Sequence, residues 1–142
     1  SFVAVQGTSQ SVATTHYTQQ CTNPAFIGAL LIDILDYDYE GSPEEGFTFE
    51  SQVSYWQLGD TLGVITFPGE SLTRNGLPVR DALPQPFGMF YGLTGDTLGY
   101  FVPTDEWESG RNGGYEESVS TDMYAGDATQ EIAIDLITSK HK

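Results

Sequence analysis

The feature that most constrains the fold is a strand–turn–strand pattern over residues 47–67. Two apolar pairs with two-residue spacing open it: Phe47 with Phe49, and Val53 with Tyr55. This two-residue period is typical of a strand with one buried face. Gly59-Asp60 is a turn signal, and residues 61–67 form a second apolar run, which Pro68-Gly69 ends. The pattern predicts a β-hairpin, so at least part of the sheet is expected to be antiparallel.

A first helix is expected before this hairpin. Residues 25–35 have apolar side chains at helical spacing, and Asn23 can cap them ahead of Pro24 at the first helical position. A buried strand is the alternative, because short apolar runs fit both structures.

Two further helices are expected after the hairpin. A short one could follow Glu70, although Gly76 and Pro78 are expected to limit its length. The last helix is expected to begin at Asp127, because a Gln lies three residues after this capping residue. Together with the hairpin, these helices predict a single domain over residues 1–142. Its class is α/β or α+β, a mixed sheet with flanking helices.

Four other segments carry weaker signals. Residues 2–5 alternate weakly, which favours a short strand, and residues 7–20 are rich in Ser, Thr and Gln, which indicates a loop or an exposed edge. Residues 87–93 are continuously apolar, which favours a buried third strand. Residues 36–46 form an acidic loop, but they lack the glycine and glutamate positions of a calcium-binding EF-hand.

Charge excludes some partners. The chain has 20 acidic and 5 basic side chains, for a net charge of −15, so it should repel nucleic acid and anionic membranes. We expect an extracellular or secreted protein, because such a surface suits that setting and the missing initiator Met indicates a processed chain. The single cysteine, Cys21, has no catalytic partner at a telling spacing and is expected to be a plain buried or semi-buried thiol.

Three segments, taken in order, resemble one family. They are LGDTLGVITFPGE (58–70), GLTGDTLGYFVPTDEW (92–107) and GYEESVSTDMYAGDATQ (114–130). Together they are similar to the end of the catalytic domain of the neutral/alkaline, non-lysosomal ceramidases, zinc amidases that cleave ceramide into sphingosine and a fatty acid. The resemblance covers residues 50–138 and implies a partial catalytic domain of a ceramidase-like hydrolase.

The resemblance also implies roles for three residues. Glu70 matches the zinc-ligating glutamate of the family, and Tyr100 matches its zinc-ligating tyrosine. Tyr115 matches a tyrosine that holds the substrate carbonyl or the oxyanion formed from it. Without the resemblance, Glu70 could equally be a helix-start carboxylate near the positive end of the helix dipole. The two tyrosines could equally be core or loop aromatics.

The implied zinc site is incomplete. The histidine ligands of the family lie far upstream of the PGE motif, and neither His16 nor His141 matches them. The chain is therefore expected to be a piece or subunit of a zinc-dependent hydrolase of lipid amides, inactive alone. An upstream segment or a partner chain, in a homo- or hetero-oligomer, would supply the rest of the site. The alternative is a relative without activity, a structural or interaction module in a secreted assembly.

Overall fold

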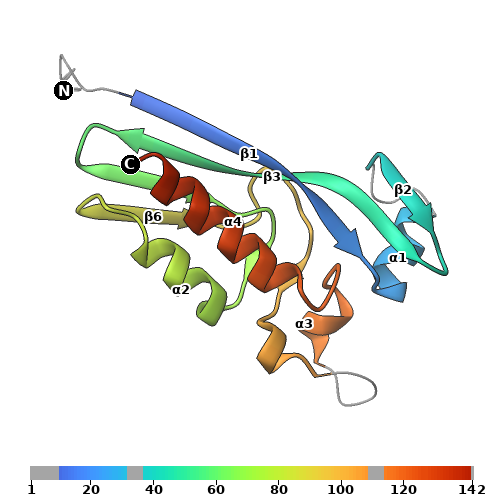
Figure 1. Cartoon of the computed structure of the whole chain (residues 1–142). Helices are drawn as coiled ribbons and strands as arrows, with labels where there is room; N and C mark the ends of the chain where they lie inside the picture. Colours follow the sequence, from blue (N-terminus) through green and yellow to red (C-terminus); the bar gives the residue numbers. More distant parts are fainter. Residues whose placement is uncertain (1–9, 32–36, 109–113, 142) are drawn as a thin grey trace, which may run out of the picture.

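A computed structural model describes residues 10–31, 37–108 and 114–141. A mixed five-stranded sheet forms one layer, and the helices α2 and α4 form the other (Figure 1). The strand order is β1-β3-β4-β6, with β2 also paired to β3. The predicted mixed sheet with flanking helices is thus confirmed, in an α+β arrangement.

The predicted hairpin is the centre of the sheet. β3 (Gly46–Leu58) and β4 (Leu62–Thr66) pair antiparallel across the turn at Gly59, whose φ of 58° favours glycine. β1 (Gln10–Cys21) pairs antiparallel along β3, so the segment predicted as a loop or an exposed edge is an edge strand. β2 (Tyr39–Ser42) also pairs with β3, so part of the expected acidic loop is a strand.

A helical crossover makes the sheet mixed. α2 (Thr73–Asp81) connects β4 to β6 (Phe87–Tyr91), and these two strands pair in parallel. The expected short helix is confirmed, with nine residues, but neither Gly76 nor Pro78 ends it, because both lie inside it. Packing of α2 on α4 and β6, which buries Val79 completely, outweighs the local cost of proline.

The prediction that the third strand is buried is also wrong. In β6, Phe87 is 64% exposed and Tyr91 is 51% exposed, and Phe90 alone packs against the core. The reason lies in the topology: β6 is the last strand of the described sheet, and the helices cover one face only. The short strand expected at residues 2–5 lies outside the described residues.

Local capping signals predicted the first helix well and the last one approximately. α1 is Pro24–Leu31, and Asn23 Oδ1 accepts a hydrogen bond from Ala25 N at 3.0 Å, as expected for the cap. α4 (Ala125–Ser139) begins two residues before Asp127, which lies in its first turn and accepts a hydrogen bond from Thr104 N.

The core lies between the inner face of the sheet and the helices α2 and α4. Its fully buried side chains include Tyr55, Ile65, Phe67, Phe101 and Ile137. Cys21 has no exposed surface, as predicted, and its burial raises the pKa of the thiol to about 11. Burial therefore favours the protonated thiol over the nucleophilic thiolate.

Candidate functional site

The corner after β4 aligns Glu70 with Tyr100. Phe67 is buried in the core, and the chain turns at Pro68-Gly69. The next strand, β5 (Glu70–Ser71), pairs in parallel with β7 (Tyr100–Phe101). Glu70 and Tyr100 are direct register partners. Because register partners project from the same face of a sheet, the carboxylate and the phenol lie side by side.

Two glycines allow the close backbone contact beneath this pair. Glu70 N donates to Gly99 O at 2.7 Å. A Cβ on Gly69 would lie 2.5 Å from the same carbonyl oxygen, and a Cβ on Gly99 would overlap the Val119 carbonyl oxygen. Gly99 also has a φ of +73°, which glycine adopts without strain. The glycines therefore set the spacing between the two site strands.

A second contact orients Tyr115 toward the pair. α3 (Tyr115–Ser118) follows the segment 109–113, and the Tyr115 ring meets the Tyr100 ring edge-on at a centroid distance of 5.8 Å. Ser120 Oγ donates to the Tyr100 carbonyl, which ties β7 to the loop after α3. The three residues singled out in the sequence thus form one cluster.

Glu70 is not a helix-start carboxylate. It lies in β5, α2 begins at Thr73 after its N-cap Leu72, and no acidic residue lies in the first turn of α2. The Glu70 side chain is exposed, and Tyr115 is 67% exposed, so a ligand has access to both.

The Glu70 carboxylate sets the acidity of Tyr100. The hydrogen bond from the protonated phenol to Glu70 is the largest of the effects that raise the pKa of Tyr100. Desolvation of Tyr100 and the negative charge of Glu70 raise this pKa further. Removal of the carboxylate charge in Glu70→Gln is therefore expected to lower the pKa of Tyr100 toward its ordinary value of 10.0. Phenol absorbance during an alkaline titration, assigned with Tyr100→Phe, measures this shift. An unchanged or higher pKa in Glu70→Gln would show that the two groups do not interact.

Zinc fits this cluster only in part. A catalytic zinc usually has three protein ligands and a water, whereas Glu70 and Tyr100 provide two oxygen donors. His16 pairs with Glu50 on β1 and β3, and His141 Nε2 lies 3.0 Å from the Tyr55 hydroxyl. Neither histidine belongs to the cluster. Within the described ranges, no three His, Cys, Asp or Glu side chains group closely enough to hold a metal ion.

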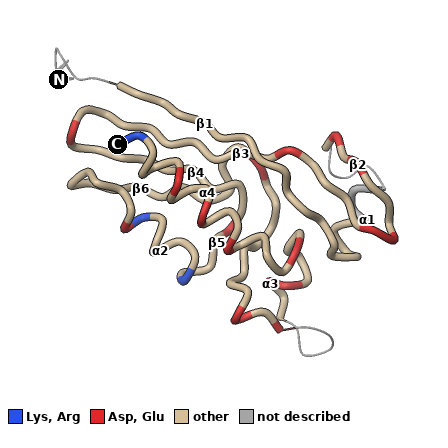
Figure 2. The backbone as a smooth tube through the Cα atoms, in the orientation of Figure 1, with Lys and Arg blue, Asp and Glu red and all other residues tan. Residues whose placement is uncertain are grey.

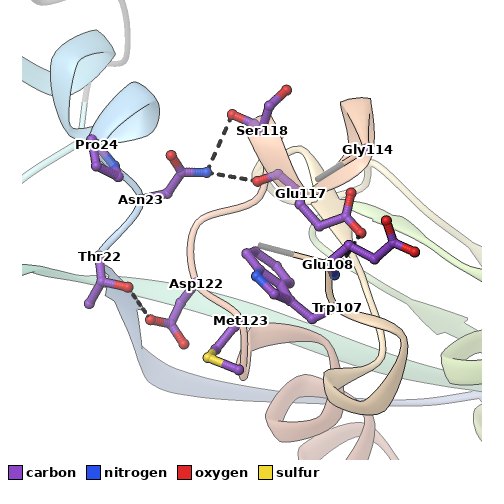
Figure 3. A pocket seen from close by; sticks show the side chains of 10 residues that line it. All are labelled: Thr22, Asn23, Pro24, Trp107, Glu108, Gly114, Glu117, Ser118, Asp122 and Met123. Atoms are coloured by element: carbon purple, nitrogen blue, oxygen red, sulfur yellow. Dashed lines mark hydrogen bonds between the residues drawn. The ribbon is translucent and has the colours of Figure 1, made fainter. Parts of the chain in front are cut away.

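A hollow that the sequence did not indicate lies beside α3. It has a volume of about 360 Å³, and Figure 3 shows Glu117, Ser118, Asp122 and Trp107 in its lining. Asn23 Nδ2 donates to the carbonyls of Glu117 and Ser120, and Thr22 Oγ1 donates to Asp122. These bonds join the end of β1 to the loop after α3, so we interpret the hollow as a structural junction.

None of the helices in the described parts of the chain is long and apolar enough to cross a lipid bilayer.

Comparison with known proteins supports the fold. No protein-family model matches the chain, and no curated protein matches it either. Among solved structures, the neutral ceramidase from Pseudomonas aeruginosa matches 65% of this chain with a TM-score of 0.53 and 15% sequence identity. A structure described as a ceramidase complexed with C2 matches 66% of this chain with a TM-score of 0.52 and 16% identity. The matched region spans 15% of each ceramidase chain. The protein therefore has a fold like that of one part of a neutral ceramidase.

Proposed function

We propose that the chain is part of a ceramidase-like, zinc-dependent amide hydrolase, and that Glu70 and Tyr100 are two of its zinc ligands. The observation that carries the proposal is the register pairing of these two residues, 30 positions apart in the chain, on neighbouring strands. The ceramidase-like fold supports it independently. A lipid amide of the N-acylsphingosine class is the proposed substrate.

The residues of this chain would act by binding and orientation. A bound zinc would supply a Lewis acid and an activated water. Tyr115 extends from α3 beside Tyr100, where its hydroxyl can donate to a substrate carbonyl oxygen. The raised pKa of Tyr100 keeps its phenol protonated near neutral pH, so zinc would have to displace that proton.

The remaining ligands would come from elsewhere. Histidines of an upstream segment or of a partner chain would complete the coordination in a homo- or hetero-oligomer. The net charge of −15 disfavours nucleic acid as a partner, and it agrees with the proposal of an extracellular or secreted setting.

The pure chain is expected to show no amidase activity toward a fluorescent ceramide analogue, even with added zinc, because its site has two donors rather than three.

The role of Glu70 and Tyr100 in binding zinc is tested by tyrosinate absorbance on zinc addition. The signal should be lost in Tyr100→Phe and weakened in Glu70→Gln, and the matched control Tyr115→Phe should retain it. Turnover by the pure chain, or an undiminished zinc signal in Tyr100→Phe, would contradict the proposal.

The alternative proposal is a non-catalytic interaction module in a secreted assembly. The observation that favours it is β1, a 12-residue strand that pairs, within the described residues, along one edge only. Such an edge can accept a strand from another chain. Binding of zinc by the wild-type chain but not by Tyr100→Phe would favour the hydrolase over this module.

A further inference from the structure

The outer face of the sheet, opposite the helices, carries an apolar patch. One row runs across four strands, because Val12 pairs with Trp56, Trp56 with Val64, and Val64 with Met89. A second row adds further apolar side chains: Leu58, Leu62 and Phe87. Val12 is 63% exposed and Trp56 is 49% exposed. We call these seven residues the outer patch.

The described part of the chain leaves this patch uncovered. α4 packs on β1 and β3 and α2 packs on β6, so both of these helices lie on the inner face (Figure 1). On the strands, inner residues such as Tyr55 and Ile65 are buried, and their outer neighbours Trp56 and Val64 are not. An apolar face open to water is uncommon in a monomer and indicates an interaction surface.

Charge is distributed unevenly over this face. β1, β4 and β6 contain no Asp, Glu, Lys or Arg, and the one such residue in β3 is Glu50 (Figure 2). Glu50 lies eight positions from Leu58 along β3, at the end of the strand that pairs with β2. Glu40 of β2 is also exposed there. The strands that carry the outer patch are thus uncharged, with Asp60 at the rim of the patch in the turn between β3 and β4, and the other half of the face is acidic.

We propose that the outer patch is the contact between two copies of this chain. An uncharged patch offers nothing to a strongly basic partner, and an acidic protein is a poor ligand for an anionic membrane. A two-fold axis near Trp56 would bring the two outer patches together and place the acidic halves at opposite ends. Two-fold dimers are the commonest oligomers, and face-to-face sheets are a common packing.

The size of the patch agrees with this partner. Its partly exposed aromatic and aliphatic side chains offer on the order of 500 Å² of apolar surface, against about 800 Å² per partner in a standard interface. The neighbouring row contributes uncharged polar contacts around it. In that row Thr14 bonds to Ser54 at 2.8 Å, and Ser54 N donates to Thr66 Oγ1. This inference is independent of the zinc proposal, because the contact needs neither Glu70 nor Tyr100.

Sedimentation velocity on the 142-residue chain tests the proposal. We expect a dimer at micromolar concentration that tightens between about 0.01 and 1 M salt, because salt screens the repulsion between two acidic copies. Trp56→Glu is expected to raise the dissociation constant at least about tenfold, since it places an unpaired charge in the interface. Met89→Glu should act in the same way.

The matched control is Leu77→Glu, which replaces a 40% exposed leucine on α2 and should leave the dimer intact. Far-ultraviolet circular dichroism confirms that each variant is folded. A wild-type chain that stays monomeric at all salt concentrations would overturn the proposal and leave the patch to a different protein. A folded Trp56→Glu dimer with unchanged affinity would overturn it as well.

Discussion

Gly99→Ala is expected to lower the free energy of unfolding by about 3 kcal/mol or more, and it could prevent folding. Two costs combine at this position. The backbone has a φ of +73°, which an alanine adopts only with strain, and the new Cβ would overlap the Val119 carbonyl oxygen. Relief would require β7 to move away from the loop after α3, which would separate Tyr100 from Tyr115. Urea unfolding followed by circular dichroism measures the effect.

The matched control for this prediction is Gly28→Ala. Gly28 lies in α1, and a Cβ there would meet nothing within 4 Å. Alanine is the better helix former, so this variant should be unchanged or more stable by up to about 1 kcal/mol. If Gly99→Ala and Gly28→Ala had similar stabilities, the close contact beneath the site would not exist as described.

Phe67→Ala is expected to destabilise the fold by about 3–5 kcal/mol, the usual cost of deleting a buried phenyl ring. The Phe67 ring is fully buried, 5.0 Å from the Phe101 ring and 5.3 Å from the Phe90 ring between centroids. It therefore joins β4, β6 and β7 directly before the Pro68-Gly69 corner. Thermal and urea unfolding measure the loss.

Phe87→Ala supplies the comparison, because it removes the same ring from a position that is 64% exposed. It should cost less than about 1 kcal/mol. Both variants are best made in the Trp56→Glu background, so that self-association does not add to the measured stability. A cost for Phe67→Ala as small as that for Phe87→Ala would show that the aromatic contacts do not anchor the corner.

Local signals predicted those parts of the fold that depend on neighbouring residues. The alternation over residues 47–58 and the turn at Gly59 predicted the hairpin, because both are properties of consecutive positions. Asn23 and Pro24 predicted the start of α1 for the same reason, since a cap bonds within one turn. The resemblance to ceramidases selected Glu70, Tyr100 and Tyr115, which the structure brings together, and their proposed roles in catalysis stay predictions.

Local signals failed where the outcome depended on distant packing. The apolar run of β6 indicated burial, but its position at the end of the sheet leaves Phe87, Met89 and Tyr91 exposed. Pro78 indicated an end of the helix, but α2 packs on α4 and continues through Pro78 to Asp81. The histidine donors that the resemblance implies could not be assigned to residues of this chain, because neither His16 nor His141 lies in the described cluster.

One repeated pentapeptide shows what the sequence by itself determined. GDTLG occurs at residues 59–63 and again at 95–99, and both copies begin with a glycine at positive φ. In the first copy the chain turns and enters β4 at Leu62, which is partly exposed. In the second copy Leu98 is fully buried, and Gly99 adopts a φ of +73° to enter β7.

Sequence alone therefore predicted a change of chain direction at each copy, because glycine and aspartate favour turns, and the chain turns at residues 59–61 and bends at Gly95. Tertiary structure decided what each turn leads to. The first turn is closed by β3, the adjacent strand, whereas the second is held by Pro68, whose carbonyl accepts a hydrogen bond from Leu98 N. That contact spans 30 residues, and it aligns Tyr100 with Glu70. Backbone bonds between distant segments thus determine which residues meet at the candidate site.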